Sequence, residues 1–213
     1  MPPQSVHDVI SIMGIPEDEL TPKVRNAIMS LLQDVDRLRQ EVAVGRAKLL
    51  QLEKLADQDS LVPMANRRAF VRELSRMISF AHRYEVPTSL LYFDINDLKT
   101  INDTLGHAAG DAVIQFVATT LNNNVRQSDL VGRLGGDEFA VLLAHSDARA
   151  AESKAAALAR KVELEPFVWE GKPIALRIAY GSYTFKDGED AAVALDAADR
   201  AMYAHKQESR QHR

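Results

Sequence analysis

A long repeat of apolar positions runs from Val24 to Ala56, with spacing that alternates between three and four residues. Such a seam is typical of an amphipathic helix that enters a coiled coil. With Ile28 taken as position a, the a residues are largely β-branched and the d residues are mostly leucine, which favours a parallel two-stranded coiled coil. The a residues are Ile28, Val35, Val42, Leu49 and Ala56, and the d residues include Leu31, Leu38 and Leu52.

Charges beside this seam agree with a parallel homodimer. Each g residue faces the e residue five places later on the partner helix. The resulting pairs are all attractive: Asp34 with Arg39, Glu41 with Arg46, and Lys48 with Glu53. The alternative is a single amphipathic helix that lies on its own domain, and Gly45 at a d position would make a weak layer in a dimer. We expect a homodimer through residues 24–56.

Alternating helices and strands follow once the heptads stop at Asp57. Helices are expected over 66–84, 111–122, 148–164 and 191–207, a strand over 88–93, a hairpin over 130–143, and a strand or hairpin over 172–185. From residue 88 onward this order is β-α-β-β-α-β, which predicts an α+β fold with a ferredoxin-like sheet and flanking helices. We therefore expect a short N-terminal segment (1–23), a coiled-coil helix (24–57) and a catalytic domain (58–213).

The start of the coiled-coil helix has its own signal. Thr21-Pro22 predicts an N-cap followed by proline at the first helical position. The segment before it is too small for a sensor domain with its own core. It could dock a regulatory protein, or it could be a tail that packs locally.

Composition narrows the classes of function. The 213 residues are 46% hydrophobic and 26% charged, which is typical of a globular chain with a sizeable core. A net charge of −4 argues against broad nucleic-acid binding, and zero cysteines remove disulfides and thiol catalysis. No apolar run approaches the roughly 20 residues that span a bilayer, and no signal peptide is visible. We expect a cytoplasmic protein without a membrane span.

Candidate chemistry lies around Gly135-Gly136, between two apolar runs. The pair predicts a hairpin turn, since glycine reaches positive φ easily. Asp137 and Glu138 follow at once, and Asp94 ends the strand expected to lie beside this hairpin. Mg²⁺ takes one or two protein carboxylates and completes its shell with water and substrate phosphates. The alternative is that these are solvated acids at strand ends.

Several motifs in register resemble the GGDEF family of bacterial diguanylate cyclases. The residues 133–139 read Arg-Leu-Gly-Gly-Asp-Glu-Phe, and the matching motifs before and after them occur in the family's order. These are 93–99 (Phe-Asp-Ile-Asn-Asp-Leu-Lys), 101–103 (Ile-Asn-Asp), Gly106-His107, Gly110-Asp111, Ala198-Asp199, Ala201-Met202-Tyr203, Lys206 and Arg210. The resemblance covers about residues 57–210.

This resemblance implies that two GTP molecules condense to cyclic di-GMP and two pyrophosphates, with one GTP half-site on each subunit. Asp94, the Ile95 carbonyl and Asp137 resemble the ligands of Mg²⁺ (or Mn²⁺). Glu138 would assist metal binding or deprotonation of the 3′-hydroxyl. Gly135 and Gly136 would let the backbone approach the phosphates.

The resemblance also supplies the remaining substrate contacts. Asn102 and Asp111 resemble the guanine readers, and a carboxylate facing the guanine N–H groups would reject adenine. Lys206 and Arg210 share one helix face and would hold the triphosphate, with Lys99 adding positive charge. The plainer alternatives are loop closure or helix capping for Asn102 and Asp111, and a solvated basic helix end for Lys206 and Arg210.

Arg126 and Asp129 resemble the family's Arg-x-x-Asp site for product inhibition, at which cyclic di-GMP binds away from catalysis. A guanidinium and a carboxylate suit the phosphates and base edges of a guanylate. A salt bridge at a helix C-terminus is the alternative.

Departures from the family pattern are few. They are 62–65 (Val-Pro-Met-Ala), Asn96, 179–181 (Ala-Tyr-Gly) and Ser209. None removes a proposed metal or guanine contact, so we favour an active cyclase. The competing hypotheses are a catalytically silent receptor for cyclic di-GMP that signals through its coiled coil, and a bare coiled-coil interaction module, which leaves the acids unexplained.

The seam yields the first testable prediction. Light scattering at micromolar protein should give twice the mass of one chain, because the apolar a and d positions gain burial only against a partner helix. A monomeric mass under these conditions would contradict the coiled-coil dimer.

Overall fold

The computed structural model of the protein describes residues 21–186 and 188–211, without the side chains of residues 50–55 and 209–211. Most of the expected N-terminal segment therefore lies outside the described residues. The boundary between two compact units falls between Ala56 and Asp57.

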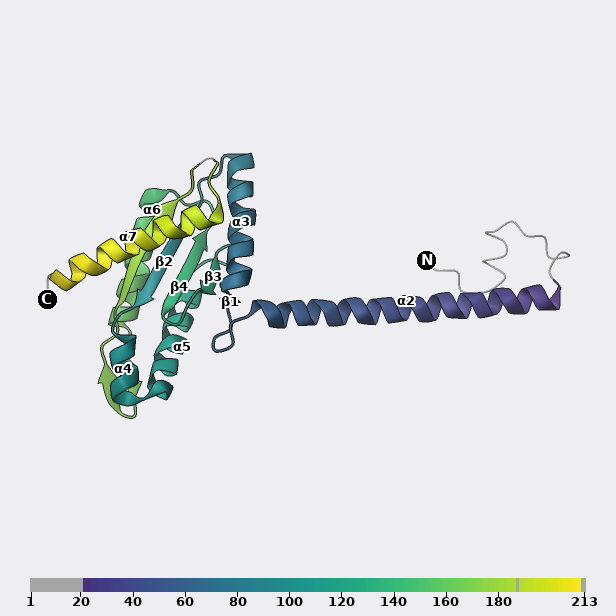
Figure 1. The fold of residues 1–213 in the computed structure, drawn as a ribbon, viewed down its shortest axis with the longest axis horizontal. Coiled ribbons are helices and arrows are strands. Elements are labelled where there is room, and N and C mark those ends of the chain that lie inside the picture. Colours follow the sequence, from purple (N-terminus) through teal and green to yellow (C-terminus); the bar gives the residue numbers. More distant parts are fainter. Residues whose placement is uncertain (1–20, 187, 212–213) are drawn as a thin grey trace. The chain divides into compact units, whose positions relative to one another are not determined.

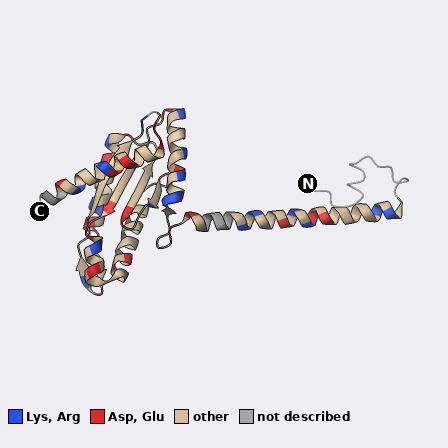
Figure 2. Ribbon diagram, viewed as in Figure 1, with Lys and Arg blue, Asp and Glu red and all other residues tan. Residues whose placement is uncertain are grey.

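Helix α2 (Pro22–Asp57) is one continuous helix of 36 residues. The N–H of Val24 donates to the Thr21 hydroxyl at 3.3 Å, so the predicted cap and first-turn proline are confirmed. Leucines of the seam are exposed within the single chain, at 64% for Leu31 and 51% for Leu38. Both acidic and basic residues are distributed along the helix (Figure 2). Among the described residues of this unit, no other element covers the apolar stripe.

Charges on α2 also pair along the helix. The Arg37 guanidinium donates to Asp34 and to Glu41, each at 3.2 Å, in exposed pairs three and four residues apart. Such pairs stabilise an isolated helix by a few tenths of a kcal/mol. They would compete with the interhelical partners that the heptad assigns to the same acids.

Five strands make the central sheet, in the order β1-β3-β4-β2-β7 (Figure 1). Their bounds are β1 Ala65–Asn66, β2 Ser89–Ile95, β3 Leu130–Arg133, β4 Glu138–Leu143 and β7 Ile178–Thr184. β1 is parallel to β3, and the other neighbours are antiparallel. The order β3-β4-β2-β7 is that of a ferredoxin-like sheet, which confirms the predicted fold class.

Five helices of this unit flank or extend the sheet. They are α3 Arg67–Tyr84, α4 Leu98–Leu105, α5 His107–Asn123, α6 Ala148–Leu164 and α7 Ala191–Gln211. The prediction of one helix over 111–122 was incomplete, because α5 begins at His107 and a separate α4 precedes it. Gly106 lies between the two helices at φ 88°, a conformation that favours glycine. No helix in the described ranges is both long and apolar enough to cross a bilayer.

The segment 172–185 contributes to two different sheets. β6 (Lys172–Ile174) pairs with β5 (Phe167–Trp169) in a small hairpin, whereas β7 belongs to the central sheet. Glu170 and Gly171 both have positive φ, as a tight two-residue hairpin turn requires. The chain therefore forms a short hairpin before it returns to the edge of the main sheet.

Both faces of the sheet are covered by helices (Figure 1). Phe93 and Phe139 pack with α5 and α6 in one cluster, while Leu90 and Tyr92 pack with α3 and α7 in the other. This alternation follows the pleat, since successive residues of a strand point to opposite faces. Asp94 follows Tyr92 by two positions, so it belongs to the α3/α7 face.

Gly181 sets how closely α7 approaches β7. A Cβ at this position would lie 2.2 Å from the Met202 nitrogen and 2.5 Å from the Ala198 carbonyl oxygen. Both are backbone atoms and cannot move aside. Residues 179 and 180 differ from the family pattern, but Gly181 is retained. It allows α7 to lie directly on the strand.

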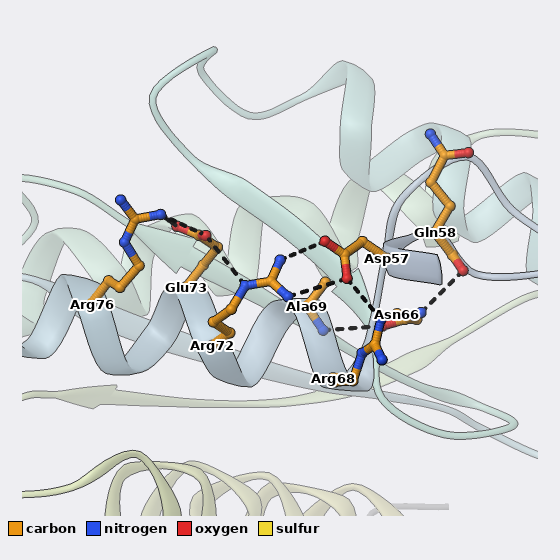
Figure 3. A network of polar contacts seen from close by, with 8 residues as sticks. All are labelled: Asp57, Gln58, Asn66, Arg68, Ala69, Arg72, Glu73 and Arg76. Atoms are coloured by element: carbon orange, nitrogen blue, oxygen red, sulfur yellow. Dashed lines mark hydrogen bonds and ion pairs between the residues drawn. The ribbon is translucent and has the colours of Figure 1, made fainter. Parts of the chain in front are cut away.

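The junction before α3 is held by polar contacts (Figure 3). Asp57 accepts hydrogen bonds from Arg72 at 2.6 Å and from Arg68 at 3.2 Å. Asn66 caps α3 by accepting from the Ala69 N–H at 3.0 Å, and its amide donates to the Gln58 carbonyl at 3.1 Å. The chain therefore enters α3 through a segment whose polar groups are paired.

Candidate active site

Asp94 carries its carboxylate on central strand β2, where every residue is buried. Asp94 is only 9% exposed, and its cross-strand partners are Glu138 on β4 and Ala179 on β7. Directly paired residues project from the same face, with Cβ atoms about 5 Å apart. Two acids therefore stand side by side at the end of the sheet.

Glu138, and not Asp137, is the residue directly opposite Asp94. Asp137 lies one position outside β4, and its carbonyl accepts a hydrogen bond from the Ile95 N–H at 3.0 Å. Asp137 thus lies beside the end of β2 through its backbone.

Lys206 of α7 forms an ion pair with Asp94, from a helix that lies across the sheet. The two side chains are 20% and 13% exposed, so the pair is largely shielded from water. The structure therefore brings together two residues that lie 112 positions apart in the sequence. Arg210 follows one turn later on α7, and its side chain lies outside the described residues.

The turn at Gly135-Gly136 has a different basis from the one predicted. The described residues with positive φ include neither glycine, so the positive-φ rationale was wrong. The Leu134 N–H donates to the Glu138 carbonyl at 2.8 Å and closes the turn. A Cβ on Gly135 would lie 2.3 Å from Glu138 Oε2. Gly135 therefore makes room for the Glu138 carboxylate.

Tyr92 is a member of the site that sequence reasoning missed. Burial raises the pKa of its phenol above the usual range, and the nearby Glu138 and Asp199 carboxylates raise it further. The phenol therefore stays protonated at neutral pH and donates a hydrogen bond to Glu138. The period of two along β2, which places Tyr92 on the face of Asp94, was the available signal.

Arg133 and Asp59 form a second connection that the sequence did not reveal. The Arg133 guanidinium donates to Asp59 Oδ1 at 3.0 Å and to the Gly136 carbonyl at 2.8 Å. Asp59 also accepts from the N–H groups of Leu61 at 2.9 Å and Val62 at 3.2 Å. The loop before β1 is thereby tied to the glycine turn.

Asn102 on α4 lies against α5 at Gly110, immediately before Asp111. A Cβ on Gly110 would lie 1.9 Å from Asn102 Oδ1, so the glycine allows this approach. Oδ1 of Asn102 is buried and accepts no hydrogen bond among the described residues. Asp111 is exposed within α5, whose N-cap is Gly106. Neither side chain caps a helix, which removes that alternative.

Lys99 and the Arg126–Asp129 turn lie outside this cluster of contacts. Lys99 is exposed in the first turn of α4. Asp129 accepts a hydrogen bond from the backbone N–H of Arg126 at 2.9 Å, and the Asp129 N–H donates to the Arg126 carbonyl at 3.0 Å. The exposed Arg126 guanidinium forms no ion pair with Asp129 among the described residues, so the alternative of a salt bridge is not what closes the turn.

The donor set suits a hard divalent cation. Within the described residues, no three acidic or histidine side chains converge closely enough to enclose a metal ion. Asp94 and Glu138 nevertheless offer adjacent carboxylates beside a strand end, and Mg²⁺ commonly takes only one or two protein carboxylates with water and phosphate. The residues present fit such an ion when a phosphate substrate completes its shell.

A comparison with family models identifies this arrangement. The model described as "Diguanylate cyclase, GGDEF domain" matches residues 56–212. The chain belongs to the GGDEF family. The match covers the sheet, its helices and every element that carries Asp94, Glu138 and Lys206.

Curated relatives of this GGDEF chain carry matching names. Diguanylate cyclase TpbB of Pseudomonas aeruginosa is 35% identical over 91% of the chain, and signaling protein YkoW of Bacillus subtilis is 34% identical over 75%. The chain spans 46% of the length of TpbB and 20% of that of YkoW. Less than half of each relative is therefore represented.

A solved structure resembles the chain over most of its length. The coiled coil and GGDEF domain of DgcB from Caulobacter crescentus, in complex with c-di-GMP, superposes with a TM-score of 0.76 at 28% identity. It covers 84% of this chain and 95% of the DgcB chain. The similarity therefore extends beyond the central sheet.

Asp59 provides a test of the link to the glycine turn. Burial alone would raise its pKa, but the Leu61 N–H and the Arg133 guanidinium outweigh burial and lower the pKa below its usual value. The ionised form therefore stabilises the fold above the unfolded-state pKa of about 3.9, and this contribution is lost as pH falls through the lower folded-state value. Asp59→Asn should reduce the free energy of unfolding at pH 7 by about 1–3 kcal/mol.

Urea denaturation at pH 7 and at successively lower pH would measure this difference. It should shrink as pH falls from about 4, the unfolded-state pKa, through the lower pKa of the folded carboxyl. Asp103→Asn, at an exposed acid of α4, is the matched control and should change little. A deficit in Asp59→Asn that does not depend on pH would contradict the ionic link.

Proposed function

We propose that this chain is a diguanylate cyclase that condenses two GTP molecules to cyclic di-GMP and two pyrophosphates. The observation that carries the proposal is the cluster of Asp94, Glu138 and Lys206 beside the glycine turn. An acid pair with a lysine at a glycine-lined turn suits a triphosphate with its metal ion. Family membership and the names of the relatives support the same activity.

In the proposed reaction, the 3′-hydroxyl oxygen of each GTP attacks the α-phosphorus of the other. Two new P–O bonds form, the two bonds to pyrophosphate break, and each hydroxyl gives up its proton. Asp94, Asp137 and the Ile95 carbonyl would hold Mg²⁺ or Mn²⁺, with help from Glu138. The bound metal would neutralise charge on the phosphates and lower the pKa of the attacking hydroxyl.

The protein side chains supply positioning. Lys206, Lys99 and Arg210 would bind the triphosphate oxygens. Glu138, oriented by the Tyr92 hydroxyl, would accept the hydroxyl proton directly or through water. The room that Gly135 leaves keeps the Glu138 carboxylate beside the turn, and Gly136 has no atom near its missing Cβ, which leaves space for phosphate.

Guanine would be read at the α4–α5 contact. Once a base separates Asn102 from α5, its unpaired Oδ1 would accept from a guanine N–H, and the exposed carboxylate of Asp111 would accept from another. Adenine would leave these acceptors unpaired, which strongly disfavours it.

One half-site per subunit requires a dimer. The exposed stripe on α2 supports pairing of two chains through residues 24–56, and the solved DgcB structure contains a coiled coil beside its GGDEF domain. Access to GTP places the proposed enzyme in the cytoplasm. A regulatory protein could act through residues 1–56.

A catalytically silent receptor is the second candidate. The exposed guanidinium of Arg126 favours binding of cyclic di-GMP together with Asp129, and this binding would act as feedback in an active enzyme. The acids Asp94, Asp137 and Glu138 are all present, and a receptor does not need them.

Synthesis of cyclic di-GMP from GTP and Mg²⁺ by the purified protein is the direct test. Asp137→Ala and Glu138→Gln should each lower the rate at least about a hundredfold, because they remove a metal ligand or a proton acceptor. Glu73→Gln, at an acid on the outer surface of α3, is the control and should retain activity. Binding of cyclic di-GMP without any synthesis would instead support the receptor.

Feedback through the Arg126–Asp129 turn makes a separate prediction. Arg126→Ala should raise the product concentration needed for half-inhibition at least about tenfold, since one charged contact to a phosphate or base edge is worth about 1.4 kcal/mol or more. Arg149→Ala, at an exposed arginine of α6, should leave inhibition as it is. Unchanged inhibition in Arg126→Ala would assign feedback to other residues.

A further inference from the structure

Several other acidic residues lie near Asp94. Glu138 lies directly opposite on β4, Asp137 is the next residue, and Asp199 of α7 lies close enough to influence the neighbouring Tyr92. A largely buried carboxylate among other acids is destabilising unless a cation compensates it. Lys206 supplies such a cation in the protein without nucleotide.

The same two residues have other partners in the proposed reaction. Asp94 would bind the metal, and Lys206 would bind the triphosphate. An ammonium group and a divalent cation at one carboxylate repel each other, so the ion pair weakens binding of the metal and the metal weakens the ion pair. Lys206 can move from one partner to the other because its charge lies at the end of a flexible four-carbon chain.

We infer that Lys206 exchanges Asp94 for the triphosphate, so that the metal and the nucleotide enter the site together. In the nucleotide-free protein, Lys206 competes with the metal for Asp94. When GTP binds, its phosphates draw the ammonium away and the carboxylate becomes available. This assignment rests on the proposed function for the identity of the metal site and of the substrate.

The exchange has a thermodynamic consequence. If the triphosphate removes a competitor of the metal, then nucleotide tightens metal binding beyond what the phosphate ligands provide. By linkage, the metal tightens nucleotide binding by the same factor. Lys206 thus acts as a positioning residue: it weakens binding of the free metal ion and favours binding of the metal–nucleotide complex.

Metal binding to the nucleotide-free protein tests the inference without reference to turnover. Mn²⁺ is the probe, and the free ion is followed by electron paramagnetic resonance. Lys206→Met keeps the length of the side chain and removes its charge, so it should bind Mn²⁺ roughly tenfold more tightly than the wild type. Lys206→Gln should show the same direction, and far-ultraviolet circular dichroism checks that both variants fold.

Arg200→Met is the matched control, because Arg200 lies on the same helix and pairs with Asp196 instead of Asp94. It removes the same unit of charge and should leave Mn²⁺ affinity unchanged. Adding Asp94→Asn to Lys206→Met should abolish the gain, since the released carboxylate is then missing. Equal or weaker Mn²⁺ binding in both Lys206 variants would overturn the inference, as would an equal gain in Arg200→Met.

The outcome also separates the inference from the proposed activity. A gain in Mn²⁺ affinity combined with no synthesis of cyclic di-GMP by the wild type would support the exchange and refute the cyclase. Synthesis by the wild type without any gain in the Lys206 variants would support the cyclase and refute the exchange.

Discussion

Asp94 places a carboxylate on the central strand of a sheet whose two faces are both covered by helices, and the surrounding structure accommodates that charge. α7 has to lie close enough for Lys206 to reach it, and Gly181 permits this approach because a side chain there would meet the α7 backbone. The neighbouring strand contributes Glu138, whose space is kept open by Gly135. The surrounding structure holds the two charges together, and a shielded ion pair of this kind adds little net stability because desolvation offsets the attraction.

Much of this arrangement could be predicted from local patterns. Continuous apolar runs predicted the buried strands, the heptads predicted α2, and the order of helices and strands predicted the ferredoxin-like sheet. Thr21-Pro22 marked the start of α2 correctly. These features succeed because each depends on residues that are close together in the sequence.

Features that depend on register or on distant partners could not be predicted. Which acid lies directly opposite Asp94 is decided by a one-residue choice of register, and the structure selects Glu138. The Asp59–Arg133 link joins residues 74 positions apart, and no local pattern announces it. The glycines of the turn were explained by backbone conformation, whereas the structure explains Gly135 by the space its neighbour occupies.

The unpaired oxygen of Asn102 has a consequence for molecular recognition. A buried acceptor without a donor lowers the free energy of unfolding by about 1–3 kcal/mol. Because the atom is shielded by the contact with Gly110, a ligand could donate to it only after α4 and α5 separate there, and the new hydrogen bond would offset part of that cost. In the proposed site, a base without a matching donor would leave the acceptor without a hydrogen bond, so discrimination at this position would come from the missing bond.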